Sequence, residues 1–541
     1  MSKTCNVEVK DSTISGAGRG LFACGDFQPG DLVLAVDRPL FAELDIHRLQ
    51  DTCAWCFQRA ATDPIERAQA ASMGLPNGFI EVKACTGCRR ISYCSKSCQS
   101  KAWKREHKYE CKALAPKDRP DLPDVVRSTI KLLGRMKADD GKYDNLATIL
   151  SFRPFEGGKG VEEFGHRNRK LLEDFNMFGF AAWKYAGEPK MREADSQAVS
   201  KAFVLNIMCN KFALSSPLDD THLGIGFDPM ICSANHSCDP NVVLVFNQPV
   251  ALLRATRPIK KGEEVFMKYI DVTNPFSVRQ NELQDTYYFS CQCPKCKKGS
   301  SFPEDTFTIP PEELSSEYRT LADKLAQKHE AQLSRFFVPA SDETAQQRLA
   351  ALQAEAFSVS GTVTDVKNPT PEEIKATLKM CIKSGLWKWT RQPVPQLCRQ
   401  LFSLYIANGD PYRAFRLGCK IYFEITPGLY PQAFYPDRLI DTWAMSTVVN
   451  VLCGPRNKQI YDELMQGGVD LRIVYFGFLF DVHDNAPKMF GLDSPFGRVV
   501  DNTYKQIMAG VNIHESEIRD KIKAVWPSLE IIARSVDVLS L

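Results

Sequence analysis

The chain has 541 residues, of which 44% are hydrophobic and 25% are charged, and its formal net charge is +3. This composition is that of an ordinary soluble globular protein, and nothing in it indicates a disordered or fibrous chain. The length has room for about three or four domains, and no apolar run approaches the ~18–20 residues that a membrane-spanning helix needs.

The first residues, from Met1 to Lys10, lack the apolar region of a secretory signal. We therefore expect the protein in the nucleus and cytoplasm, away from membranes, and as a monomer. The 19 cysteines fit a reducing compartment if they are zinc ligands and reduced core thiols. The first motif, Gly16-Ala17-Gly18-Arg19-Gly20, lacks the third glycine of a dinucleotide-binding fingerprint and indicates little alone.

Eight possible metal ligands form four close pairs between Cys53 and Cys111. Zinc needs four donors in a tetrahedron, and a pair two to four residues apart supplies two donors from one turn, so the pattern predicts two Zn²⁺ ions. A disulfide cluster or a chance pattern is the alternative, and the intracellular character of the chain disfavours it. The pairs are Cys53 and Cys56, Cys85 and Cys88, Cys94 and Cys98, and His107 and Cys111.

This spacing resembles the MYND zinc finger, in which the ligands of two ions interleave. The resemblance implies that Cys53, Cys56, Cys94 and Cys98 hold one ion, and that Cys85, Cys88, His107 and Cys111 hold the other. The gap from Phe57 to Ala84 is longer than is usual in the family. Loop-closure entropy grows only slowly with length, so the finger tolerates the insertion.

The finger is also strongly basic. From Lys83 to Lys112 there are nine Lys and Arg against two Glu, a local net charge of +7. Such a face is able to bind an acidic peptide or DNA phosphates. A solvated basic helix face that balances the thiolates explains the same charges equally well.

Residues 116–200 have an amphipathic helical pattern, whereas residues 242–269 favour short strands separated by turns. Between these regions lies Asn235-His236-Ser237-Cys238-Asp-Pro-Asn241, and further on comes Cys291-Gln-Cys293-Pro-Lys-Cys296. Three cysteines leave a structural zinc site one donor short, and Cys238 is the candidate for the fourth. A Cys238–His236 nucleophile pair is the weaker alternative, because sequence neighbours seldom have catalytic geometry.

The Asn-His-Ser-Cys motif, the strand that ends in Tyr269 and the Cys-x-Cys-x-x-Cys segment together resemble a SET domain with its post-SET zinc. A MYND finger inserted after the glycine motif resembles the SET-and-MYND family of protein-lysine methyltransferases. The resemblance implies an α+β multidomain fold, with an irregular β-rich SET domain, an inserted MYND finger and helical insert, a post-SET zinc, and an all-α, tetratricopeptide-like C-terminal domain.

The domain boundaries that we predict are numbered along the chain. They are the N-terminal part of the SET domain (1–47), MYND finger (48–115), helical SET insert (116–200), SET core (201–272), post-SET segment (273–300), linker with helices (301–392) and helical C-terminal domain (393–541). In the last region two apolar stripes, from Leu397 to Tyr405 and from Phe415 to Phe423, predict two helices around a short turn. An ordinary helical bundle is the alternative to a tetratricopeptide unit.

The resemblance also implies a cofactor, S-adenosyl-L-methionine (SAM), in addition to three Zn²⁺, and a protein substrate with a reactive lysine. Tyr269 would be catalytic and would aim its hydroxyl at the transferring methyl group. Cofactor contacts would come from Ala17, Gly18, Arg19, Asn210, Asn235, His236, Tyr269, Tyr287 and Phe289. Without the family, the aromatic residues among these would be interpreted as plain core residues.

Two other classes of function compete with the enzyme. A catalytically weak scaffold or transcriptional co-regulator would use the MYND finger and the helical domain to bind partners. A DNA-binding regulator would depend on the basic finger alone. The intact set of transfer-site residues favours the methyltransferase.

Overall fold

The structure is a computed structural model of the chain. It describes residues 6–60, 80–115, 120–138, 169–190, 195–216, 222–247, 249–336, 338, 340, 342–361 and 369–537. The stretch Ala68–Gly78 of the finger insertion, and residues 116–119, 139–168 and 191–194 of the helical insert, lie outside the described residues.

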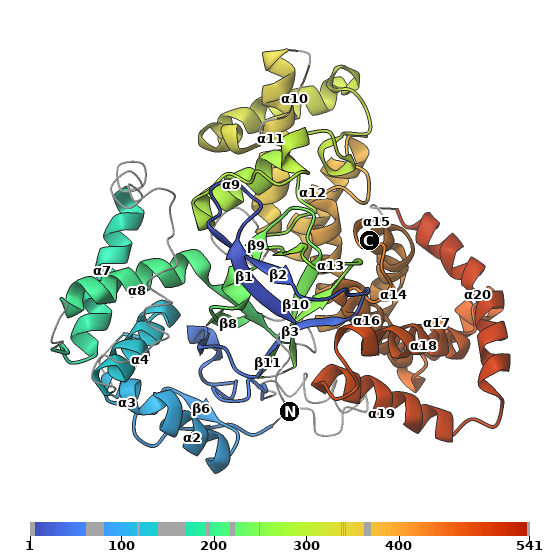
Figure 1. Cartoon of the computed structure of the whole chain (residues 1–541). Helices are drawn as coiled ribbons and strands as arrows, with labels where there is room; N and C mark the ends of the chain where they lie inside the picture. The colour runs from blue at the N-terminus through green and yellow to red at the C-terminus, as the bar shows by residue number, and fades with distance from the viewer. Residues whose placement is uncertain are drawn as a thin grey trace. The chain divides into compact units, whose positions relative to one another are not determined.

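The chain divides into two compact units. The first consists of Met1–Tyr269 with the short segments Gln284–Ser290 and Asp493–Phe496, and the second of Ile270–Leu283, Cys291–Leu492 and Gly497–Leu541. In the first unit small sheets and a few helices share one hydrophobic core, whereas all the regular elements in the described part of the second unit are helices. In Figure 1 the strands lie in the blue and green parts of the chain and the helices of the second unit run from green to red.

The strands of the first unit form small, mostly antiparallel sheets, in the orders β1-β2-β12-β9, β10-β11-β3, β4-β8-β7 and β5-β6. One pairing is parallel: β9 lies beside β12, with Asn235 opposite Phe266 and His236 opposite Met267. The bounds are β1 Val7–Asp11, β2 Arg19–Ala23, β3 Leu32–Val36, β4 Phe41–Leu44, β5 Lys83–Ala84, β6 Ser92–Tyr93, β7 Phe212–Ser215, β8 His222–Phe227, β9 Asn235–His236, β10 Val242–Asn247, β11 Val250–Ala255 and β12 Glu264–Met267.

The finger and the helical insert of this unit contain several helices. In the finger, Ser95 caps α2 by accepting a hydrogen bond from the backbone of Cys98, which places this cysteine in the first turn. The bounds are α2 Lys96–Ala102, the π-helical turn η2 Trp103–His107, α3 Lys108–Leu114, α4 Asp124–Ala138, α7 Arg169–Tyr185 and α8 Ser196–Asn210. Helix α9, Phe276–Tyr287, begins after the strand that precedes Tyr269.

The second unit packs its helices around a core of its own. Typical end signals set the helix bounds: Thr370 and Glu373 form a capping box at the start of α12, and Gly361 takes a left-handed conformation (φ +78°) after α11. The helices are α10 Ser316–Lys328, α11 Glu343–Ser360, α12 Pro371–Lys383, α13 Val394–Ala407, α14 Pro411–Lys420, α15 Thr426–Leu429, α16 Pro436–Leu452, α17 Lys458–Gln466, α18 Leu471–Met489, α19 Pro495–Ala509 and α20 Glu515–Ser535.

The predicted fold class is confirmed. The β-rich front part contains the strands expected from residues 242 to 269, and α13 and α14 form the two predicted helices around a turn at Gly409. The domain boundaries given above stay predictions. Among the described helices, none is both long enough and apolar enough to cross a lipid bilayer.

Close helix packing in the second unit leads to a stability prediction. Gly418 lies in α14, and a Cβ added there would clash with the Met445 sulfur and approach a ring atom of Phe402 to 3.0 Å. Gly418→Ala should therefore destabilise the helical unit by about 1–3 kcal/mol, although alanine is the better helix former by about 1 kcal/mol. Thermal unfolding measures the effect. A melting temperature equal to or above that of the wild type would contradict this packing.

Candidate functional site

Eight of the candidate zinc ligands gather into two clusters in the finger. Cys53, Cys56, Cys94 and Cys98 form one, and Cys85, Cys88, His107 and Cys111 form the other. The ligand atoms of each cluster lie within 4.8 Å of one another. This is the interleaved pairing that the MYND resemblance implies.

The distances inside the two clusters fit a tetrahedral metal site. A Zn–S bond of about 2.3 Å places two sulfur ligands about 3.8 Å apart. The Sγ atoms of Cys56 and Cys94 are 3.6 Å apart, those of Cys94 and Cys98 3.4 Å, and those of Cys85 and Cys111 3.9 Å. A disulfide requires about 2.05 Å, and all the described cysteines are free, so the disulfide alternative is excluded for them.

The histidine ligand also has the expected second partner. Its Nε2 atom lies 3.7 Å from Cys88 Sγ, and its Nδ1 atom lies 2.8 Å from Glu110 Oε1. A carboxylate on the outer nitrogen fixes the tautomer that presents Nε2 to the metal, which is the usual arrangement around zinc. Glu110 was not predicted from the sequence.

The third cluster consists of Cys238, Cys291, Cys293 and Cys296, which are all buried and whose sulfurs also lie within 4.8 Å of one another. The backbone N–H groups of Cys293 and Cys296 point to the sulfurs of Cys291 and Cys293, at 3.5 Å each. Such N–H groups stabilise thiolates, the form that binds zinc. Cys238 belongs to the same group of possible metal ligands, and its role as the fourth donor stays a prediction.

His236 connects this cluster to the candidate catalytic strand. Its Nδ1 atom accepts a hydrogen bond from the backbone N–H of Tyr269 at 3.1 Å, so the proton of the neutral ring is on Nε2. Nε2 lies 3.3 Å from Cys238 Sγ. Both ring nitrogens of His236 are thus engaged within the protein, so we expect a polar contact of this residue with a cofactor to come from its backbone.

The glycine motif forms an exposed loop between β1 and β2, and the buried carboxylate of Glu264 holds it. Glu264 is 3% exposed and accepts hydrogen bonds from the Ser12 hydroxyl (2.7 Å), from the Thr13 backbone (2.7 Å) and hydroxyl (2.5 Å), and from the Asn235 amide (3.0 Å). The Asn235 amide also donates to the Arg19 carbonyl at 2.9 Å. These contacts place the loop beside β9.

Gly20 and Gly18 serve this loop in different ways. A Cβ at Gly20 would collide with the Glu264 carboxylate, so the carboxylate requires glycine there. Gly18 takes φ +68°, and no heavy atom lies within 4 Å of the place of an added Cβ. The exposed residues Ala17, Gly18 and Arg19 therefore border open space that a ligand is able to fill.

The three aromatic candidates lie around His236. The ring centroids of Tyr269 and Tyr287 are 4.9 Å apart, and His236 lies 5.4 Å from Tyr269 and 6.2 Å from Phe289. The Tyr269 hydroxyl donates to the Ala234 carbonyl at 2.9 Å, and the Tyr287 hydroxyl donates to the Tyr269 carbonyl at 3.2 Å. These bonds fix both rings.

Burial determines the charge state of Tyr269. It raises the pKa of the hydroxyl above its ordinary value, and the neighbouring Cys232 and Tyr287 add to this effect. The phenol is thus neutral at physiological pH. Because its proton is directed to Ala234, the lone pairs of the oxygen remain available to a ligand.

Asn210 is the last candidate, at the end of α8. Its backbone carbonyl accepts a hydrogen bond from the Cys232 thiol at 3.0 Å, and Cys232 precedes Asn235 by three residues. Its side-chain amide donates to the Asn206 carbonyl of the same helix at 2.9 Å. The fold therefore brings Asn210 toward the Asn235–His236 strand. The roles of all these residues toward cofactor and substrate stay predictions.

Comparisons with known proteins bear on this site. The family model described as SET domain matches residues 18–270. Histone-lysine N-methyltransferase SMYD3 of Homo sapiens is 28% identical over 67% of this chain and 80% of its own length. N-lysine methyltransferase SMYD2 of Homo sapiens is 30% identical over 52% of this chain and 58% of its own length.

A third relative carries both domain names. SET domain and MYND-type zinc finger protein 6 of Schizosaccharomyces pombe is 31% identical over 53% of this chain and 51% of its own length. The chain is similar to SET-and-MYND proteins, and the SET domain model matches its residues 18–270. The matched part spans four fifths of the length of SMYD3 and somewhat more than half the length of the other two relatives.

Two carboxylates of the site, Glu264 and Glu110, were not predicted from the sequence. Each looks like an ordinary polar residue in its segment, because Glu264 follows a Gly-containing turn and Glu110 lies in a basic helix. Only the contacts show that Glu264 reaches a loop about 250 residues away and that Glu110 reaches a zinc ligand.

The clusters lead to a prediction about metal content. Elemental analysis of the purified chain should give three zinc ions, and Cys238→Ser should reduce the number to two, because it removes one ligand of a four-ligand site. Cys24→Ser is the matched control, since Cys24 is a half-buried thiol outside the three clusters, and it should keep three ions. Equal zinc contents in the two variants would contradict the third site.

Proposed function

We propose that this chain is a SAM-dependent protein-lysine N-methyltransferase that acts on histone or non-histone proteins. The observation that carries the proposal is that the Asn235–His236 strand is hydrogen-bonded both to the glycine loop, through Asn235, and to Tyr269, through His236. The two human relatives, which are named lysine methyltransferases, support the same activity.

SAM supplies a methyl group on a sulfonium, and the protein has to bind, orient and shield the reactants. The lysine amine must be neutral to attack, because an ammonium has no lone pair. The rings of Tyr269, Tyr287 and Phe289 offer apolar walls, and an apolar environment lowers the pKa of a lysine by desolvation. The same walls exclude water.

The Tyr269 oxygen orients the reactants in this proposal. The Tyr269 hydroxyl donates its proton in a hydrogen bond to the Ala234 carbonyl. The lone pairs of the oxygen therefore remain available to accept weak C–H···O contacts or a hydrogen bond from an amine. A neutral phenol is a poor base, and the lysine therefore has to lose its proton before transfer. The Tyr287 hydroxyl keeps the Tyr269 backbone in place.

The residues of the loop fit the amino-acid end of SAM. Open space beside Gly18 and the exposed backbone from Ala17 to Arg19 leave room for a polar ligand. The side chains of Asn235 and His236 hold the protein together, so their backbone groups are the ones that remain for the cofactor. Asn210 would contribute from the end of α8.

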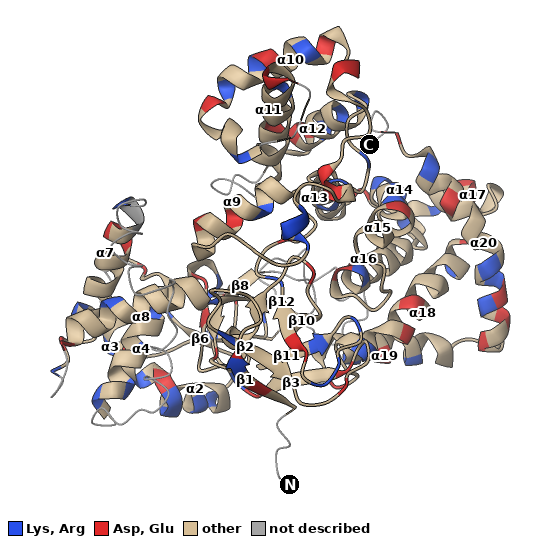
Figure 2. Ribbon diagram, turned by 45° about the horizontal axis from the view of Figure 1, so that its top comes forward, with Lys and Arg blue, Asp and Glu red and all other residues tan. Residues whose placement is uncertain are grey.

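A partner-binding role is the second candidate, and the finger carries the observation that favours it. Seven of its basic side chains are exposed, and blue segments follow α2 in Figure 2. They are Lys83, Arg89, Lys96, Lys101, Lys104, Lys108 and Lys112. We infer an acidic peptide as the partner, with DNA as the weaker alternative.

We also propose that the protein is a monomer and that it is found in the nucleus and cytoplasm.

The Tyr269 hydroxyl allows the main test of the enzyme. Tyr269→Phe removes one oxygen and adds no bulk, so turnover of a protein substrate should fall about 10- to 1000-fold, which corresponds to ~1.4–4 kcal/mol. SAM affinity should change little, because the lost interaction forms in the transition state. Radiolabel transfer from methyl-labelled SAM measures turnover, and calorimetry measures affinity.

Tyr412→Phe is the matched control, because Tyr412 is an exposed tyrosine on α14. It should behave as the wild type does. A Tyr269→Phe enzyme with wild-type turnover would place the catalytic centre elsewhere. It would also favour the scaffold, because partner binding by the finger does not need this hydroxyl.

Asn235 tests the cofactor loop. Asn235→Ala removes the amide that binds the Arg19 carbonyl and the Glu264 carboxylate, so SAM affinity should fall by about tenfold or more, since a hydrogen bond to a charged group contributes roughly 1.5–3 kcal/mol. Asn457→Ala, which removes an exposed amide bound to the Val451 carbonyl, is the control. Unchanged SAM affinity in Asn235→Ala would refute the role of this loop. His236→Ala is a poorer test, because it also disturbs Cys238.

A further inference from the structure

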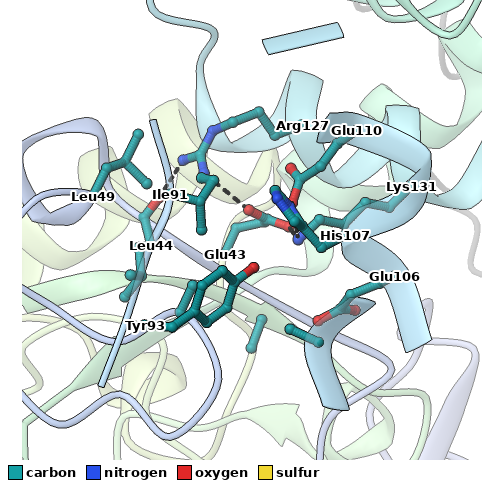
Figure 3. Close-up of a pocket in the computed structure, with 13 residues that line it drawn as sticks. Glu43, Leu44, Leu49, Ile91, Tyr93, Glu106, His107, Glu110, Arg127 and Lys131 are labelled. Carbon is teal, nitrogen blue, oxygen red and sulfur yellow. Dashed lines mark hydrogen bonds and ion pairs between the residues drawn. The ribbon is translucent and has the colours of Figure 1, made fainter. Parts of the chain in front are cut away.

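Buried charged side chains connect the finger to the SET domain, all within the first unit. Figure 3 shows that Arg127 and Lys131 from α4 meet Glu43 from β4, with His107 and Glu110 of the finger beside them. The cations of this network are Arg38, Arg127, Lys131 and Arg135, and its carboxylates are Glu43, Glu106 and Glu110.

Lys131 lies at the centre of a continuous chain of contacts that begins at a zinc ligand. His107 Nδ1 is 2.8 Å from Glu110 Oε1, and the same oxygen is 3.2 Å from Lys131 Nζ. The Lys131 ammonium also contacts the Glu43 carboxylate, whose other oxygen accepts from Arg127 at 3.0 Å. The Lys131 side chain is only 7% exposed.

The charges of the network and of the second zinc cluster complement each other. With Glu43 ionised, four cations face three carboxylates, which leaves one positive charge in excess. Three thiolates, one neutral histidine and one Zn²⁺ carry one negative charge in excess. Buried charge is costly unless it is compensated nearby, so each part needs the other.

Burial and the neighbouring charges have opposite effects on the pKa values of Lys131 and Glu43. Burial lowers the pKa of a lysine, yet the carboxylates of Glu110, Glu43 and Glu106 outweigh burial and raise the pKa of Lys131 above its ordinary value. Burial raises the pKa of Glu43 to about 7, against the charge of Lys131. Glu43 therefore depends on its cations to stay ionised.

Glu43 connects the buried charge network to the strands that precede the candidate cofactor residues Asn235 and His236. It lies in β4 opposite Ile225 of β8, and the ring of Phe41 stacks on Phe227 with centroids 5.5 Å apart. The chain continues from β8 into the short helix Ile231–Ser233 and then to Asn235. An ordered β4 thus helps to fix the position of β9, the strand that carries the candidate cofactor residues.

We propose that Lys131 is the counter-ion shared by the second zinc site of the finger and the SET sheet, so that zinc occupancy of this site and the order of β4 and β8 are coupled. The finger is then a structural part of the SET domain in addition to any binding role. Loss of the zinc leaves the network with uncompensated charge, and loss of Lys131 does the same to the zinc cluster.

The first test removes the shared charge. Lys131→Met should speed the release of finger zinc to a chromogenic chelator by about 10-fold, the lower end of the effect for residues that contact a metal ligand directly, because Lys131 acts through Glu110. Lys137→Met is the matched control, because Lys137 is an exposed lysine on the same helix, and it should release zinc at the wild-type rate. Glu43→Gln added to Lys131→Met restores the charge balance and should bring release back to within about threefold of wild type.

Equal release from Lys131→Met and Lys137→Met would overturn the proposal. Failure of the double variant to recover would overturn the charge argument, because a purely steric role of Lys131 does not predict recovery.

The second test uses the wild-type chain and needs no folded variant. A chelator is added in steps, alkylation of Cys85, Cys88 and Cys111 followed by mass spectrometry reports loss of the second zinc, and hydrogen exchange reports on β4 and β8. Protection of Phe41–Leu44 and His222–Phe227 should fall in parallel with alkylation. Unchanged protection in chains that have lost this zinc would overturn the coupling. Neither test uses turnover, so both are independent of the proposed function.

Discussion

The candidate site depends on one buried carboxylate, Glu264. It accepts hydrogen bonds from the loop at Ser12 and Thr13 and from the amide of Asn235, and its position requires glycine at residue 20. A carboxylate that is 3% exposed needs such donors, since an unpaired buried charge is costly. The hydrogen bonds that it accepts hold the exposed glycine loop against the strand that carries the candidate cofactor residues.

Metal ligands add a second layer of constraint. His236 accepts from the backbone of Tyr269 and lies 3.3 Å from Cys238, so the zinc ligand, the candidate cofactor strand and the candidate catalytic tyrosine share one histidine ring. In the finger, His107 and Glu110 have a similar arrangement toward Lys131. In both places contacts connect a candidate zinc cluster to a neighbouring strand of the first unit.

The enzyme and the scaffold hypotheses use different parts of this molecule. The scaffold needs the exposed basic face of the finger and the helical unit, whereas methyl transfer needs the ordered hydroxyl of Tyr269 and the open space beside Gly18. The hydrogen bonds of Tyr269 and Tyr287 fix polar groups in an otherwise aromatic cluster. Such ordering has a cost in conformational entropy, and an orienting role for the hydroxyl explains it directly.

Much of this organisation could be predicted from the sequence, because its signals are local. These signals are pairs of zinc ligands in a tight turn, glycine at a left-handed position, and the alternation of apolar and polar residues along a strand. The pairs of cysteines, the strands between residues 242 and 269 and the hairpin of α13 and α14 are of this kind. The resemblance to the family supplied the partition of ligands between the two finger ions. What only the tertiary structure decided are contacts between segments distant in sequence: Glu264 with Thr13, Lys131 with Glu43 and Glu110, and His236 with Tyr269. A glutamate or lysine carries no local signal of burial, because its partner is chosen by the fold that brings the opposite charge within reach.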